Sequence, residues 1–200
     1  MIVTRPMNPS RRAVLAGGGA LVLSFSLAPR RLAAQGAQNA GAQPIAEPPL
    51  SGSLKTDPML DSWIRIHANS KITVFTGKAE LGQGIKTALI QLAAEELVVE
   101  PAAIHLVTAD TAQTPNEGYT AGSHSMQDSG TAIMNAAAQV REILIATAAA
   151  RLQLPPERLT AGEGAVIADD GGRLNYGELV SDQILHVHAE PRSDLLNPDH

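Results

Sequence analysis

The sequence contains no cysteine and few aromatic residues. The lack of cysteine excludes disulfides, cysteine-ligated iron–sulfur clusters, haem attachment through CxxCH and cysteine nucleophiles within this chain. Any redox chemistry must therefore use a cofactor that other groups hold. Aromatic residues make up 2% of the chain and Trp63 is its one tryptophan, so a packed core must rest on Leu, Ile, Val and Ala.

Basic residues are scarce beyond the first 34 positions. Five of the fifteen Lys and Arg residues precede residue 35, where no acidic residue occurs. The formal net charge is −5, and without these five the remaining ten basic residues face twenty acidic ones, a balance of −10. An acidic chain with few aromatics for base stacking repels phosphate backbones, which argues against nucleic acid as a partner.

Residues 1–34 have the pattern of an export signal. Arg11 and Arg12 precede a short apolar segment that is too glycine-rich for a transmembrane span. A twin arginine at this place is typical of a Tat signal, and Arg30 and Arg31 fit because a basic residue there disfavours the Sec route. A Sec signal or an uncleaved anchor is the alternative. We therefore expect a periplasmic protein, with membrane association left open, that folds around a bulky cofactor before export.

The rest of the chain predicts a flexible linker over residues 35–58 and a folded domain over residues 59–190. The linker is rich in Gly, Ala, Gln and Pro. Periodicity and turn residues in the domain predict, in order, a hairpin or a strand with a turn before it (62–77), a helix (85–97), a strand (103–109) and a long helix (131–152). A strand, an Asp-Gly turn, a strand and a helix start follow (165–179). The fold class is α/β or α+β, with helices packed on a mixed sheet.

The chain also contains a weak internal sequence similarity. Residues 93–110 and 148–169 each run from a helix end through a proline turn towards a strand. Two βα-like units in one layer would explain this similarity, whereas two copies are too few for a solenoid.

A polar stretch without periodicity, residues 110–130, precedes the long helix. A loop of this length in a compact domain is functional or disordered. We expect Asp128 to Gly130 to cap the helix that follows. His186 and His188 share a strand face, but no acidic or cysteine partner has metal-site spacing, so we interpret them as surface histidines.

Residues 77–87, GKAELGQGIKT, place glycines between a β-branched run and an amphipathic helix. Gly77 and Gly82 have the spacing of a phosphate loop, but lysine does not follow the second glycine. A dinucleotide fingerprint fails because Thr87 stands where a glycine is required. Taken alone, the G-Q-G tripeptide is also compatible with a tight turn into a helix.

Two longer segments resemble a known family. ITVFTGKAELGQGIKTALIQLAAEEL and HLVTADTAQTPNEGYTAGSHSMQDSG are similar to the molybdopterin-binding large subunit of the xanthine dehydrogenase/aldehyde oxidase family, in particular its isoquinoline 1-oxidoreductase beta-subunit branch. The resemblance covers about residues 60–190. It implies the first part of a molybdenum-cofactor-binding domain.

The resemblance also implies a site. In the family, the glutamine of the G-Q-G loop donates a hydrogen bond to an oxygen ligand of molybdenum, which makes Gln83 the catalytic candidate. The implied cofactor-binding residues are Gly82, Gln83, Gly84, Gly122 and Ser123, and none of them ligates the metal directly. We further expect the N-terminus of the helix after Gly84 to favour the anionic phosphate of the cofactor.

Family members oxidise N-heterocycles or aldehydes with water as the oxygen donor, and a glutamate far along the chain acts as general base. No residue here corresponds to that glutamate, so we expect the N-terminal part of such a subunit, inactive alone, with residues 191–200 as a truncated connection. The implied partners are an iron–sulfur small subunit and the remainder of the large subunit. The alternative is a non-catalytic exported domain that keeps the fold for assembly or binding.

Overall fold

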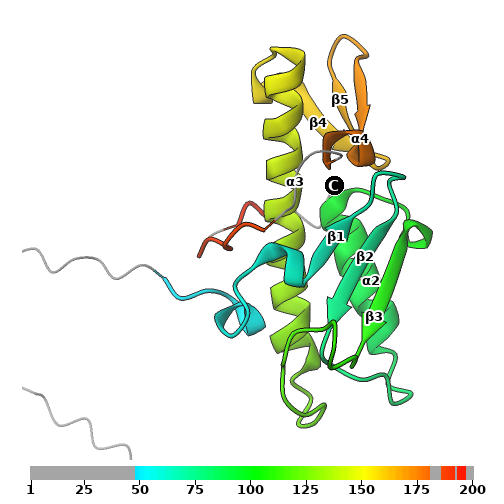
Figure 1. Cartoon of the computed structure of the whole chain (residues 1–200), viewed down its shortest axis with the longest axis vertical. Coiled ribbons are helices and arrows are strands. Elements are labelled where there is room, and N and C mark those ends of the chain that lie inside the picture. The colour runs from blue at the N-terminus through cyan, green and yellow to red at the C-terminus, as the bar shows by residue number, and fades with distance from the viewer. Residues whose placement is uncertain (1–47, 181–185, 192, 197–200) are drawn as a thin grey trace, which may run out of the picture. The chain divides into compact units, whose positions relative to one another are not determined.

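Two helices cover one face of a short mixed sheet, and a second small sheet follows at one end of the longer helix (Figure 1). This computed structural model describes residues 48–180, 186–191 and 193–196. The predicted export signal lies outside the described residues. Within the described ranges, no helix combines the length and the apolar composition needed to cross a membrane.

The mixed sheet has the order β1-β2-β3. Its strands are β1 (Ile64–Ile66), β2 (Ile72–Thr76) and β3 (Ile104–Thr108). β1 and β2 form an antiparallel hairpin, whereas β2 and β3 are parallel, with Val74 opposite Leu106. The predicted hairpin, the third strand and the mixed sheet are confirmed.

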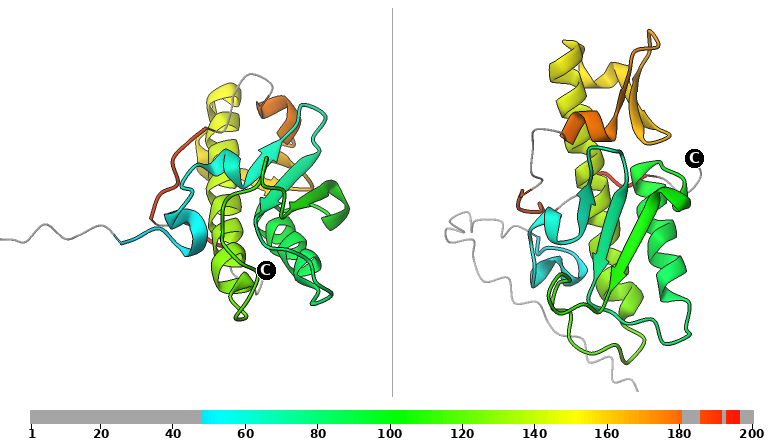
Figure 2. Two further views of the ribbon diagram at one scale, coloured as in Figure 1. Left: turned by 60° about the horizontal axis from the view of Figure 1, so that its bottom comes forward. Right: turned by 45° about the vertical axis from the view of Figure 1, so that its right-hand side comes forward.

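Helix α2 (Ile85–Leu97) makes the crossover that a parallel strand pair requires (Figure 2). It follows the predicted range, with Leu89, Ala93 and Leu97 fully buried at helical spacing. Its last turn ends at Val98, which has a left-handed conformation (φ 52°) and donates its N–H to carbonyls of that turn.

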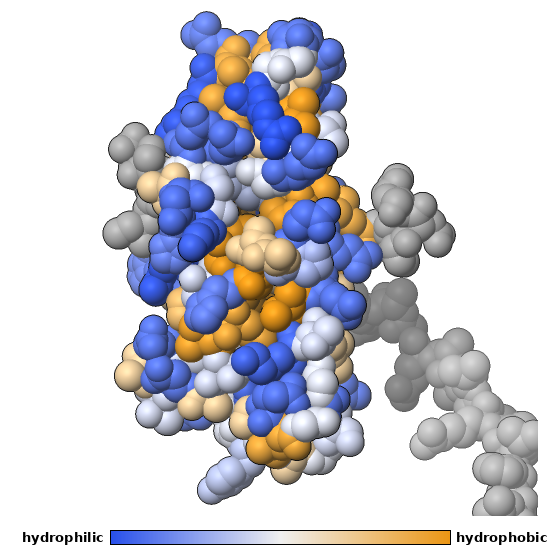
Figure 3. Space-filling view, turned by 90° about the vertical axis from the view of Figure 1, so that its right-hand side faces the viewer, coloured by the Kyte–Doolittle hydropathy of each residue, from blue (hydrophilic) through white to orange (hydrophobic). Residues whose placement is uncertain are grey.

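The core lies between the sheet and the long helix α3 (Thr131–Leu152), which also follows its predicted range. The side chains of Ile64, Val74 and Leu106 point from the three strands into this core. Fully buried alanines on α3, including Ala136 and Ala137, let the helix approach closely. Seen from the side of β3 and α2, apolar residues gather over the middle of the molecule and hydrophilic residues flank them (Figure 3).

A second sheet follows α3 and is entirely antiparallel. It consists of β4 (Leu159–Gly162), β5 (Ala165–Ala168) and β6 (Arg173–Asn175), and α4 (Tyr176–Val180) follows it. The predicted Asp-Gly turn and the strands on either side of it are confirmed. The buried Tyr176 hydroxyl donates to the Leu97 carbonyl at 2.7 Å, and burial raises the pKa of Tyr176 to about 12, so it remains a donor.

The internal similarity between residues 93–110 and 148–169 is limited to the way in which the two helices end. Val98 after α2 and Gln153 after α3 both have left-handed backbone, and a proline-containing 3₁₀ turn and a strand follow each of them. The expectation of two βα-like units in one layer is wrong, because β3 lies in the mixed sheet and β4 lies in the second sheet. The repeated feature is therefore a way to end a helix.

Packing begins earlier than the sequence predicts. Gly52–Lys55 forms a 3₁₀ turn whose Leu54 is fully buried in the core, although this segment falls within the predicted linker of residues 35–58. Residues 35–47 lie outside the described part. A single apolar side chain among Gly, Pro and polar residues gives no periodic signal, which is why composition alone suggested a flexible segment.

Residues 186–191 and 193–196 pack along α3, and we call them the strap. The Gln139 side chain pairs with both the N–H and the carbonyl of Glu190, at 2.8 and 3.0 Å. Arg141 donates to the Asp194 carbonyl, and Glu96 accepts from the Leu196 N–H at 3.2 Å. Packing therefore continues past the predicted domain end at residue 190.

Candidate functional site

Two loops leave the carboxyl ends of the parallel strands β2 and β3 at the same edge of the sheet (Figure 1). We call residues 77–84 the glutamine loop and residues 109–125 the second loop. The backbone N–H of Ala79 in the glutamine loop donates to Thr120 Oγ1 in the second loop at 2.8 Å. The structure thus joins the two segments that the sequence singles out, at the edge where open α/β sheets bind ligands.

Residues 81–84 of the glutamine loop are exposed, and two glycines shape this turn. Gly82 and Gly84 have φ angles of 93° and 80°, and a Cβ at either position would have no atom within 4 Å. Gln83 Nε2 donates to the Ala79 carbonyl at 2.9 Å, and its Oε1 accepts from the Leu81 N–H at 2.5 Å. An amide nitrogen carries two hydrogens, so one N–H of Gln83 remains for a group outside the loop.

Glu80 is a site residue that sequence reasoning missed. Its carboxylate accepts hydrogen bonds from the backbone N–H groups of Gly82 (2.7 Å), Gly84 (3.1 Å) and Lys86 (3.0 Å). The backbone N–H groups of Lys86 and Gly84 lower the pKa of Glu80 below its usual range. An acidic residue just before two glycines and a helix was the available signal.

This geometry corrects one expectation. We expected the N-terminus of α2 to favour the phosphate of a cofactor, but the Glu80 carboxylate already binds the Gly84 and Lys86 N–H groups there. A second anion at the same place would be repelled by the first.

A partly buried polar cluster around Glu117 ties the second loop to the end of β2. We call Glu117, Thr76, Gly77 and Ser129 the Glu117 cluster. Thr76 Oγ1 and the Gly77 N–H donate to Glu117 Oε2, both at 2.8 Å. Ser129 Oγ lies 2.6 and 2.7 Å from the two carboxylate oxygens, and Thr76 and Ser129 are fully buried. Sequence reasoning missed Glu117 as well.

Lys78 is a buried cation beside this cluster. Its Nζ donates to the Glu117 carbonyl at 2.9 Å and to Asp128 Oδ2 at 3.2 Å, and only 2% of the residue is exposed. The expected cap at Asp128 to Gly130 is wrong. These residues belong to a π-helical turn, Met126–Gly130, that runs directly into α3 without a side-chain cap, and Asp128 is bonded to Lys78 instead.

The predicted pocket residues Gly122 and Ser123 lie exposed on the second loop, both with left-handed backbone (φ 67° and 59°). The structure brings their loop beside the glutamine loop, but in the described part of the chain these two residues do not contact Gln83 through a hydrogen bond. Their role in cofactor binding remains a prediction.

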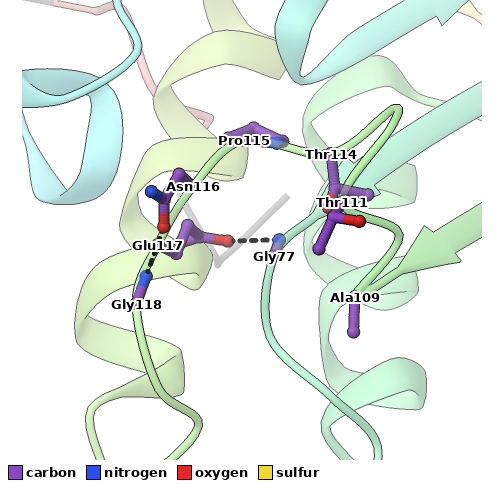
Figure 4. A pocket seen from close by; sticks show the side chains of 8 residues that line it. All are labelled: Gly77, Ala109, Thr111, Thr114, Pro115, Asn116, Glu117 and Gly118. Atoms are coloured by element: carbon purple, nitrogen blue, oxygen red, sulfur yellow. Dashed lines mark hydrogen bonds between the residues drawn. The ribbon is translucent and has the colours of Figure 1, made fainter.

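A pocket of about 330 Å³ lies between Gly77 and the first half of the second loop (Figure 4). Its polar walls include Thr111, Asn116 and Glu117, and Glu117 faces the Gly77 N–H across it. In the part of the chain that the structure describes, no three His, Asp or Glu side chains gather as a metal site. His186 and His188 are exposed, and His186 Nδ1 contacts Asp61 at 3.0 Å.

Comparisons with known proteins give relatives that are much longer than this chain. A nicotinate dehydrogenase subunit of Pseudomonas putida is 33% identical over 187 residues, which cover 94% of this chain and 15% of that protein. The beta subunit of isoquinoline 1-oxidoreductase from Brevundimonas diminuta is 31% identical over 127 residues, or 60% of this chain and 16% of that protein. The chain thus spans less than a fifth of the length of these relatives.

A solved structure shares the fold. Reconstituted CO dehydrogenase from Oligotropha carboxidovorans matches with a TM-score of 0.53 and 22% identity, over 68% of this chain and 18% of that one. At this identity the likeness shows the fold alone.

The residues of the glutamine loop fit a molybdenum cofactor, because an exposed neutral N–H donor beside two open glycines suits oxygen groups on a metal. Residues 32–194 match the family described as molybdopterin cofactor-binding domain. That range covers most of the chain and confirms the family resemblance of residues 72–97 and 105–130. The chain belongs to the molybdopterin cofactor-binding domain family, whose cofactor is a molybdenum cofactor.

Proposed function

We propose that the chain is part of the large subunit of a molybdenum-dependent dehydrogenase or hydroxylase, and that Gln83 contributes to its cofactor site. The observation that carries this proposal is the joining of the glutamine loop to the second loop at the carboxyl ends of β2 and β3. The Glu117 cluster supports it, because a partly buried polar network at this edge connects the bases of both loops.

The proposed role of Gln83 follows from its amide. A neutral donor can bind an oxygen group of the cofactor without changing the charge of the site. One Nε2 hydrogen is used within the loop, which fixes the direction of the other. When bound, a molybdenum cofactor of this family would supply the oxidation of the substrate, with water as the oxygen donor.

We propose an N-heterocycle as substrate, with an aldehyde as the alternative. The names of two relatives, nicotinate dehydrogenase and isoquinoline 1-oxidoreductase, support this order. The chain has no cysteine for an iron–sulfur cluster, so electron transfer would require an iron–sulfur partner subunit and the remainder of the large subunit. Export by the Tat pathway to the periplasm is proposed from the sequence of residues 1–34 alone, with its twin arginine, apolar segment and following basic pair.

The test is Gln83→Ala in the assembly of this chain with those partners. We expect turnover to fall about 10- to 100-fold, as for other residues that contact the ligands of a metal, while the melting temperature stays unchanged because Gln83 is exposed. Gln91→Ala, on the exposed side of α2, is the matched control. The chain alone serves as the blank and should show no dye-linked oxidation. Equal turnover of the two variants would remove Gln83 from the proposed site.

A further inference from the structure

Glu80 binds the backbone of the glutamine loop from inside. Its Oε1 accepts from the N–H groups of Gly82 and Gly84, and its Oε2 accepts from that of Lys86, at 2.7, 3.1 and 3.0 Å. These groups converge because Gly82 and Gly84 both have positive φ angles, a conformation that L side chains rarely adopt. A carboxylate of the chain itself therefore fills the concave backbone that would otherwise bind an external anion.

One of these three contacts acts on the loop, one acts on Gly84 where the loop passes into α2, and one acts on the helix itself. A carboxylate that only capped α2 would need the N–H groups of the first helical turn, such as that of Lys86. Glu80 also binds Gly82 and Gly84, the residues on either side of Gln83. Its contacts therefore determine the shape of the glutamine loop as well as the start of α2.

The direction of the Gln83 side chain depends on this shape. Both bonds of its amide are to backbone groups of the same loop, the Ala79 carbonyl and the Leu81 N–H. If the backbone between residues 79 and 84 relaxed, these two groups would move and the free N–H of Gln83 would lose its fixed direction.

We propose that Glu80 is a positioning residue that holds the glutamine loop in the shape that directs the Gln83 amide outward. An effect of this positioning on catalysis rests on the proposed function. The positioning itself depends only on contacts within this chain. It also follows that the N-terminus of α2 carries its own anion and does not bind a phosphate.

The first test uses amide NMR on the full 200-residue chain, with no cofactor present. Glu80→Ala removes all three acceptors, and Glu80→Gln keeps one oxygen for Gly82 and Gly84 but turns a donor towards Lys86. We expect hydrogen exchange of the Gly84 and Lys86 amides to accelerate about tenfold in Glu80→Ala. In Glu80→Gln the change should be confined mainly to Lys86. Glu95→Ala, an exposed glutamate on α2, is the control and should change none of these amides.

The second test titrates inorganic phosphate into each protein. In Glu80→Ala the freed N–H groups should bind phosphate, so that the Gly82, Gly84 and Lys86 amide signals shift with concentration, whereas the wild type should not respond. Unchanged exchange in Glu80→Ala, or the same phosphate response in the wild type, would overturn the proposal. Because Glu80 is largely solvated, both variants are expected to fold, which the dispersion of the remaining signals checks.

The third test separates this proposal from the proposed function. In the assembly with the partner subunits, Glu80→Ala should lower kcat without raising KM, and Glu80→Gln should recover part of the loss. Altered amides together with unaffected kcat in both Glu80→Ala and Gln83→Ala would support positioning and refute the proposed function. A lower kcat with unaltered amides would refute positioning.

Discussion

Replacing Glu117 tests whether the Glu117 cluster holds the two loops together by its geometry or by its charge. In Glu117→Gln, the amide oxygen can accept from the Gly77 N–H and the Thr76 hydroxyl, as Oε2 does now. The amide nitrogen can donate to Ser129 Oγ, and the Ser129 hydroxyl can then donate to Thr76, whose Oγ1 lies 2.7 Å away. Every polar group of the cluster therefore keeps a partner in Glu117→Gln.

Glu117→Ala leaves one group without a partner. The Thr76 and Ser129 hydroxyls can rotate to bond each other, but the Gly77 N–H has a fixed direction and loses its acceptor. Orphaning this half-buried donor, which lines the pocket, costs about 1–2 kcal/mol, and the lost bonds from the two hydroxyls add about 1 kcal/mol. We expect Glu117→Ala to lower the free energy of unfolding by about 2–3 kcal/mol and Glu117→Gln by less than about 1 kcal/mol.

Urea denaturation of the full chain measures these differences, provided that the m-value is the same in all variants. Glu157→Ala removes an exposed glutamate and should change the free energy of unfolding by less than about 0.5 kcal/mol. Hydrogen exchange should accelerate in the glutamine loop and in the second loop of Glu117→Ala only. If Glu117→Gln cost as much as Glu117→Ala, the carboxylate charge rather than the bonding pattern would hold the loops, and our reasoning would be refuted.

Two further predictions concern the buried ion pair of Arg141 with Glu96 and the carboxylate of Glu80. Arg141 and Glu96 are both buried, and a guanidinium nitrogen of Arg141 lies 2.7 Å from Glu96 Oε2. Arg141→Met leaves the Glu96 charge without its partner and should lower the free energy of unfolding by about 3–5 kcal/mol. Adding Glu96→Gln should recover part of this loss, and additive losses in the double variant would contradict the prediction. Because the folded-state pKa of Glu80 is lowered, its bonds to Gly84 and Lys86 should persist at pH values above its ordinary pKa of 4.5 and be lost as the pH falls through the lowered pKa. The amide shifts of Gly84 and Lys86 should therefore titrate together below pH 4.5, and a midpoint above that value would disprove the assignment.

The two long helices and the hairpin of the mixed sheet could be predicted because each is encoded locally. Helices α2 and α3 have apolar residues at helical spacing, and a proline soon follows each of them, at Pro101 and at Pro155. The start of α3 was misjudged for a physical reason. Asp128 is a good capping residue by type, but its carboxylate bonds Lys78, fifty positions away, and the chain continues through a π-helical turn.

The sequence singled out the two loops of the candidate site, but not the contacts that hold them together. Gln83 and its two glycines were predicted as site residues because G-Q-G before a helix resembles a family motif. Glu117 was missed because its partners Thr76 and Ser129 lie 41 and 12 positions away, and no spacing pattern encodes such contacts. Glu80 lies within the same segment as Gln83. It was missed because the two glycines were interpreted by the close backbone approach that they allow, and not by the acceptor that their N–H groups bind.

The strap along α3 has a consequence for how this part of the chain can vary. The contacts of Gln139 with Glu190, of Arg141 with Asp194 and of Glu96 with Leu196 all reach peptide groups of the strap rather than its side chains. Point substitutions at the exposed strap residue Glu190 should therefore be well tolerated, whereas Ser193, whose hydroxyl bonds Gln139, and the buried Ala189 are the exceptions. A one-residue insertion or deletion there would shift every later peptide group away from its partner on the helices, so the length of this segment is more constrained than its composition.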